Sequence, residues 1–170
     1  TGAFTGCSGL KELVIHQKKG LKSCAKEILG ELWQKIDVDF LYENGDAGGK
    51  RAHMVFPEHY DEAVENTPAR ILFTEYHGSG TNYRQCFYSK ELDFAEYDSL
   101  FDMAVVMDKL EVLVDMSFGR LRYPWQLSEK AKKQYEDYIQ GNLKDIGEFL
   151  VESGSLNGLE LLSREKLWNR

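Results

Sequence analysis

The chain has 170 residues, of which 42% are hydrophobic, and it is long enough for one domain with a real core, or for a repeat stub plus one domain. Its formal net charge of -7 argues against a nucleic-acid binder that works by neutralising phosphates, and against adhesion to anionic membranes. No apolar run approaches the length of a membrane span, so membrane insertion is not expected.

Residues 1–15 have the apolar spacing of one turn of a solenoid repeat. The apolar positions recur every three residues and then every two, where a strand is expected to begin, and they are Phe4, Cys7, Leu10, Leu13 and Ile15. A single repeat of this size cannot bury its own apolar face, because such repeats rely on stacked neighbours. We therefore expect a fragment cut from a longer protein at the edge of a repeat array, with Cys7 buried inside the repeat.

The next part of the chain predicts a helix followed by a hairpin. Apolar residues recur at helical spacing over 21–36, and alternation over 38–42 indicates a strand. A glycine-rich loop over 44–49 leads to a second short strand over 51–56. This second strand is expected to pair back on the first as a hairpin.

Beyond Pro57 the pattern is less regular. Residues 59–66 are expected to form a helical turn, and 69–76 a third strand. A second flexible loop over 77–82 follows. The aromatic stretch 83–88 fits either a fourth strand or the start of a helix, because periodicity does not decide over so short a run.

From Glu96 onward the sequence is predominantly helical. Helical spacing continues until Pro124, with a strand over 111–118 as the second choice. Ser128 is a good N-cap for a helix over 129–139. Two further short helices are then expected over the remaining residues.

These last helices cover 143–151 and 156–168. Gly154 between them suits a left-handed C-cap. Short helices joined by glycine-containing turns are typical of ankyrin-like or other helical-hairpin stacks.

Two parts of the sequence resemble one bacterial protein family. The first fifteen residues resemble the BspA-type (Treponema-type) leucine-rich repeats, whose consensus sequence is close to AF-x-G-C-S-x-L-x-x-V-x-I-P. His16 stands where that family usually has proline. The second part, roughly 83–163, is similar to the C-terminal region that follows such repeats in proteins of gut Firmicutes. The resemblance implies a shared domain and no enzymatic role. The residues that carry the second resemblance are Tyr97, Asp98, Phe101, Arg120, Leu121, Tyr123, Pro124, Leu127, Ser128, Tyr135 and Tyr138.

The most distinctive charge in this second motif is Arg120. It lies between apolar residues near the end of the helix that Pro124 closes, so we expect it to form an ion pair. The candidate partners are Asp115 on the same helix, and Glu136 or Asp137 across the turn.

Two groups of residues are candidates for catalysis. Glu75 and His77 lie at a predicted strand end beside a flexible loop, which is a common catalytic placement. Asp37, Asp39 and Glu43 lie on the first strand of the hairpin, but the acid-x-Lys pairing of nucleases is missing. The cysteines and histidines are scattered, and neither glycine-containing loop has a phosphate-binding form, so no metal and no cofactor are expected.

We predict an α+β fold with a short leucine-rich-repeat edge, a small antiparallel sheet and a helical C-terminal half with ankyrin-like short helices. The expected units are a repeat stub over 1–16, an α+β domain over 17–127, and helical hairpins over 128–170. The expected function is non-catalytic protein interaction or scaffolding, with an unidentified protein partner, at the C-terminus of a bacterial leucine-rich-repeat protein. The alternatives are an immunity-type protein that neutralises a toxin, and a hydrolase that uses Glu75 and His77. The sequence leaves localisation open between the cytoplasm and the cell surface.

Overall fold

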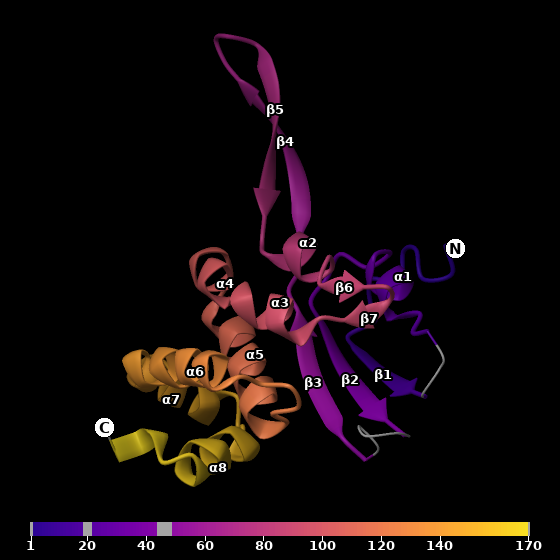
Figure 1. Cartoon of the computed structure of the whole chain (residues 1–170). Coiled ribbons are helices and arrows are strands. Elements are labelled where there is room, and N and C mark those ends of the chain that lie inside the picture. The colour runs from indigo at the N-terminus through magenta and orange to yellow at the C-terminus, as the bar shows by residue number, and fades with distance from the viewer. Residues whose placement is uncertain (1, 19–21, 44–48, 170) are drawn as a thin grey trace.

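The computed structural model describes residues 2–18, 22–43 and 49–169, and it has a mixed α+β fold (Figure 1). A three-stranded sheet lies beside a group of helices, and a two-stranded ribbon projects away from both (Figure 1). This is the class that the sequence predicts. All of the loop expected over 44–49 except its last residue lies outside the described residues.

The main sheet is built from three strands in the order β1-β2-β3. They are β1 (Glu12–Gln17), β2 (Ile36–Tyr42) and β3 (Arg51–Phe56). The expected hairpin is confirmed, because β2 and β3 pair antiparallel. Strand β1 pairs with the other side of β2 in parallel, so the main sheet is mixed rather than antiparallel.

The predicted helix over 21–36 is much shorter than expected. Within the described part of this range only α1 (Ala25–Leu29) is an α-helix. The reason is a tertiary contact, since the guanidinium of Arg84 donates to the carbonyl oxygens of Leu29 (3.1 Å) and Leu32 (2.9 Å). These carbonyls therefore have partners without a longer helix, and the chain turns early into β2.

The helical turn predicted over 59–66 is wrong, because this segment is strand β4 (Tyr60–Asn66). It pairs antiparallel along its whole length with β5 (Ile71–His77), which the sequence places over 69–76. A helix of about eight residues is marginal in isolation, whereas a neighbouring strand supplies partners for the backbone of the whole segment. The chain adopts the structure that pairs more backbone groups.

The ambiguous stretch 83–88 divides between the two predicted possibilities. Its first residue ends α2 (Gly80–Tyr83), and its last two form β6 (Phe87–Tyr88), which pairs with β7 (Glu91–Leu92). Helix α2 also occupies part of the loop that the sequence places over 77–82.

The C-terminal half is helical, as predicted. Its helices are α3 (Phe94–Ser99), α4 (Phe101–Met107), α5 (Leu110–Arg122), α6 (Glu129–Gly141), α7 (Leu143–Glu152), α8 (Leu156–Arg164) and the 3-10 helix η2 (Leu167–Asn169). The strand alternative over 111–118 is wrong, since these residues lie inside α5. The N-cap is confirmed, because the Ser128 hydroxyl accepts a hydrogen bond from the backbone N–H of Ala131 (3.1 Å).

The turn between α7 and α8 also has the predicted cap. Gly154 has a φ of +66°, and the N–H of Ser155 reaches back to the carbonyl of Leu150 (2.9 Å), which is the pattern of a Schellman turn. Helix α8 ends at Arg164, earlier than the predicted 168, and Lys166 beyond it has a φ of 53°.

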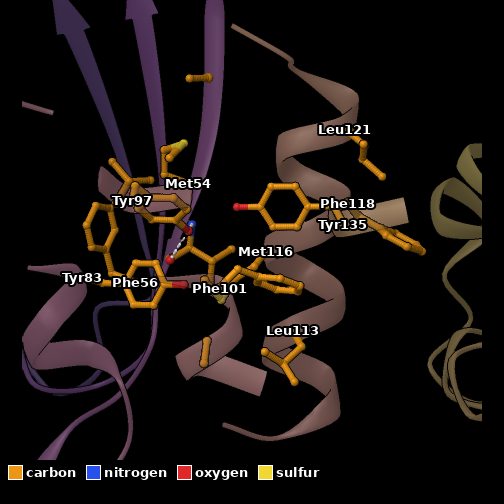
Figure 2. Packing of buried hydrophobic residues seen from close by; sticks show 14 of the residues in the cluster. Met54, Phe56, Tyr83, Tyr97, Phe101, Leu113, Met116, Phe118, Leu121 and Tyr135 are labelled. Carbon is orange, nitrogen blue, oxygen red and sulfur yellow. Dashed lines mark hydrogen bonds between the residues drawn. The ribbon is translucent and has the colours of Figure 1, made fainter. Parts of the chain in front are cut away.

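One continuous apolar core joins the sheet to the helices (Figure 2). In its centre the ring of Tyr97 on α3 lies 5.8 Å from that of Phe56 on β3, and the ring of Phe101 lies 4.6 Å from that of Tyr135 on α6. Helix α5 approaches β3 closely, because a Cβ on Gly119 would lie 2.7 Å from the His53 ring. The C-terminal helices therefore share the core of the sheet domain.

The described part of the predicted repeat, residues 2–15, leads into β1 at the edge of the sheet opposite β3 and is only partly covered. Phe4, Leu10, Leu13 and Ile15 are half-buried and pack against the core. Cys7 is exposed, so the expectation that it is buried is wrong. It lies in a tight turn, where its carbonyl accepts hydrogen bonds from the Leu10 N–H and the Gln34 amide, and no second coil is stacked on it in the described chain.

Candidate interaction site

The second sequence motif forms a buried network around the carboxylate of Asp98. The side chain of Arg120 donates to it twice, from Nε (2.8 Å) and from an η nitrogen (2.8 Å), and the Tyr135 hydroxyl donates to it as well (2.8 Å). The Arg120 side chain is 0% exposed and that of Asp98 is 5% exposed. Arg120 also donates to the carbonyl of Trp125 (3.0 Å), so this group links α3, α5, α6 and the turn before α6.

The predicted partners of Arg120 are therefore wrong. Asp115 pairs instead with Lys35 (2.7 Å), and on α6 Glu136 pairs with Lys132 (3.8 Å) and Asp137 with Lys133. Arg120 is on the buried face of α5, whereas these acidic side chains are partly or largely exposed.

Most other residues of this motif surround the same corner. Tyr97 donates its hydroxyl proton to the carbonyl of Val55 (2.6 Å) and accepts from the N–H of the same residue (3.1 Å), so it satisfies backbone groups at the edge of β3. Phe101 lies against the rings of Tyr135 and Tyr138. The remaining members lie in or beside the turn that joins α5 to α6, and they are Leu121, Tyr123, Pro124, Leu127 and Ser128. The motif thus forms a structural corner where α3, α5 and α6 meet.

A polar cleft of about 330 Å³ lies between the sheet, α5 and the start of α8. Within it His53 contacts Asp39 (3.0 Å) and Asp37 (3.5 Å), and hydrogen bonding to Asp37 and then Asp39 raises the pKa of His53 against the opposing effect of burial. Asp39 also pairs with Arg51 (2.9 Å) and Asp37 with Lys35 (3.0 Å). The predicted acidic cluster is thus held in ion pairs: Lys35 links Asp37 to Asp115 on α5, Asp39 is paired within the sheet, and Glu43, beyond the end of β2, pairs with His16 (2.6 Å).

The ribbon of β4 and β5, which we call the arm, is the most exposed element of the fold (Figure 1). Solvent reaches both of its faces, because successive strand residues point to opposite sides and nearly all of them are exposed. Five of its large apolar side chains are exposed, and they are Tyr60 (48%), Ile71 (60%), Leu72 (72%), Phe73 (41%) and Tyr76 (68%).

The arm is fixed firmly at its base. The guanidinium of Arg84 is buried and donates to the carbonyls of Pro57 (2.5 Å) and Gly80 (3.0 Å), which flank the arm on either side. The backbone N–H of Ser79 and its hydroxyl both donate to the carboxylate of Asp108. The base therefore has a defined position on the body, although the strands themselves project into solvent.

The two predicted catalytic side chains lie on this arm. His77 stacks on Tyr60 with ring centroids 4.5 Å apart, and it contacts Glu62 (3.3 Å) and Glu75 (3.9 Å). Glu75 is opposite Glu62 in the strand pairing, and its side chain is 48% exposed. The geometry is that of a surface ion pair on an open ribbon.

Sequence reasoning predicts the strand β5 and leaves its aromatic residues Phe73 and Tyr76 open between core residues and anchors for a partner; the structure exposes both. A signal was present, since Leu72 and Tyr76 point to one face and Ile71 and Phe73 to the other. A strand that is apolar on both faces is usually buried on both, but among the described residues β4 and β5 form a separate two-stranded sheet.

The chain was compared with protein-family models, curated proteins and solved structures, and none of them matches it. Among the described residues no helix combines the length and apolar character that crossing a membrane requires. In the same residues no group of three or more His, Cys, Asp or Glu side chains is arranged to hold a metal ion.

Proposed function

We propose that this chain is a non-catalytic protein-interaction domain, and that the arm is its contact surface. The observation that carries the proposal is the exposure of large apolar side chains on both faces of a ribbon that projects from the body. Exposed apolar surface of this kind marks protein interaction sites, and an isolated two-stranded ribbon is at best marginally stable in water. A partner that covers the arm removes this surface from water and stabilises the ribbon.

The body is suited to present such an arm. The buried Asp98–Arg120 pair joins the helices to one another, and the Tyr97–Val55 contacts join α3 to the sheet. Arg84 holds the base of the arm through the carbonyls of Pro57 and Gly80, which flank its two strands. The arm is therefore held in one orientation, which lowers the entropy lost on binding.

We further propose that the parent protein carries BspA-type leucine-rich repeats before this domain. The parallel pairing of β1 with β2 supports this, since each residue of β1 lies opposite the residue 25 positions later in the chain. Leucine-rich repeats have periods of about 20–29 residues and place successive strands in parallel. In this proposal β2 occupies the position of the next repeat's strand, and the short hairpin helices α7 and α8 form the ankyrin-like end of the domain.

Site-specific photo-crosslinking tests the interaction proposal. Tyr76 on the arm and Tyr88 on the body are both strongly exposed tyrosines, at 68% and 81%, so they form a matched pair of positions for a benzoylphenylalanine side chain. In cells that express the natural parent protein, the Tyr76 position is expected to give a discrete protein adduct and the Tyr88 position none. Equal labelling at the two positions, or no adduct at Tyr76, would overturn the assignment of the arm.

A further inference from the structure

The two outer edges of the arm differ in charge. Strand β4 carries three carboxylates, Asp61, Glu62 and Glu65, whereas β5 carries only Glu75. In the described chain β4 and β5 pair only with each other, so the outer backbone groups of each strand have no strand partner. Charged side chains protect an exposed edge against pairing with another chain. The edge of β4 has this protection, and the edge of β5 largely lacks it.

The sequence of β5 is complementary to itself in the antiparallel direction. Its seven residues run from Ile71 to His77, with Thr74 at the midpoint. If two copies of β5 pair around Thr74, Leu72 of one copy lies opposite Tyr76 of the other, and the two Thr74 residues face each other. Aromatic–aliphatic and Thr–Thr pairs are favourable cross-strand neighbours. On the opposite face Glu75 lies across from Phe73 of the second copy, so this register places no two like charges opposite each other.

The ends of the arm are also complementary in this register. Arg70 at the tip is a cation without an ion-pair partner among the described residues. In the paired arrangement it lies opposite Gly78 of the second copy, at the base of the other arm. The backbone carbonyl of Glu58 lies against Gly78 at that base, and the carboxylate of Asp108 accepts hydrogen bonds from Ser79 beside it, while the charge of Arg84 is buried against backbone carbonyls. The tip of each arm thus places its positive charge at the base of the other arm, where the carboxylate of Asp108 is held by Ser79.

From these features we propose that β5 pairs antiparallel with β5 of a second copy of this chain, centred on Thr74, to form a four-stranded sheet. This inference rests on the proposed function of the arm and specifies its partner. The two-fold arrangement is closed, because the outer strands of the new sheet are the two β4 strands with their carboxylates. It therefore yields a dimer and not a fibre.

The dimer is expected to be weak. A strand of seven residues with a tip contact supplies fewer contacts than the ~20–30 residues per partner of a standard interface. A dissociation constant in the micromolar range is the corresponding expectation.

Sedimentation velocity on the whole chain, from about 1 to about 300 μM to bracket that range, is the first test. The unmodified chain is expected to shift from monomer to dimer. The double variant Leu72→Lys/Tyr76→Lys places lysine opposite lysine twice in the dimer and should stay monomeric throughout. It should keep the circular dichroism and melting temperature of the unmodified chain, because both side chains are largely exposed.

Disulfide trapping tests the register independently. In a Cys7→Ser/Cys24→Ser background, which removes the two exposed native thiols, Thr74→Cys places two cysteines directly opposite each other across the two-fold axis. Opposed antiparallel residues are about 4.5–5.5 Å apart between Cα atoms, which suits a disulfide. The matched control is Ala63→Cys, which is opposite Thr74 on the same face but on the outer strand. Thr74→Cys should give a covalent dimer at concentrations where Ala63→Cys does not.

The self-pairing would be overturned by a chain that is monomeric at every concentration, or by a dimer that survives Leu72→Lys/Tyr76→Lys. It would also be overturned by growth beyond the dimer, or by equal disulfide trapping of Ala63→Cys and Thr74→Cys. A monomeric chain whose Tyr76 position still crosslinks to a different protein would overturn only this inference and leave the proposed function standing. A monomeric chain with no adduct at Tyr76 would overturn both.

Discussion

Replacement of Asp98 by asparagine should destabilise the fold more than most single substitutions. The change keeps the shape of the side chain and its contact with Tyr135, but it leaves the charge of Arg120 without a counter-charge at a position that is 0% exposed. Removal of one partner from a buried ion pair costs about 3–5 kcal/mol. Since small domains have about 5–15 kcal/mol of stability in total, the loss is a large fraction of it.

The assay is urea denaturation of a double-mutant cycle with Asp98→Asn and Arg120→Met. The double variant contains neither buried charge, so its loss of stability should be smaller than the sum of the two single losses by at least about 2 kcal/mol. The control is the exposed pair Lys133–Asp137, where Lys133→Ala should change the free energy of unfolding by no more than about 0.5 kcal/mol. Additive losses in the cycle, or a loss below about 1 kcal/mol for Asp98→Asn, would refute the reasoning.

Three further predictions concern other parts of the body. Hydrogen bonding to Asp37 raises the pKa of His53, so its stabilising contribution is full below about pH 6.5 and is lost as the pH rises through the folded-state pKa. Between about pH 5.5 and about pH 8, the free energy of unfolding measured with urea should therefore fall more for the unmodified chain than for His53→Gln. An equal fall for the two chains would contradict this. Gly119→Ala should destabilise the fold by about 1–3 kcal/mol, because the added Cβ would meet the ring and the carbonyl of His53. The control is Gly141→Ala on α6, whose Cβ meets no other atom, so thermal melting should show it to be neutral or stabilising. Burial raises the pKa of Cys86 to about 12, so iodoacetamide should alkylate two of the three cysteines in the native chain by intact mass, and a third modification before unfolding would argue against the packing.

Local signals in the sequence predict the C-terminal half well. The Ser128 cap and the left-handed Gly154 are short-range features, since the interactions that define them lie within a few residues. The helices on either side of these residues begin where the apolar spacing places them, although α8 ends at Arg164 rather than at 168. The sequence thus contains the starts of these helices as well as their type.

Features that depend on distant residues could not be predicted in the same way. The partner of Arg120 is 22 residues away on another helix, and helix 21–36 is cut short by Arg84, which is more than 50 residues from the carbonyls it satisfies. The arm is a similar case. Its strand pattern is visible in the sequence, but its exposure depends on whether the main sheet or the helices cover it, and these are built from other parts of the chain.

Arg84 explains why an exposed ribbon can have a defined position. Burial lowers the pKa of Arg84 to about 10, so the guanidinium remains charged near neutral pH, yet its hydrogen-bond partners are backbone carbonyls rather than a carboxylate. These carbonyls come from the end of α1, from the segment between α1 and β2, and from the two residues that flank the arm at its base. One side chain therefore ties the arm to the turn that begins β2, the central strand of the sheet. In the proposed function a partner covers the apolar surface of the arm, and Arg84 fixes the direction in which the arm meets that partner.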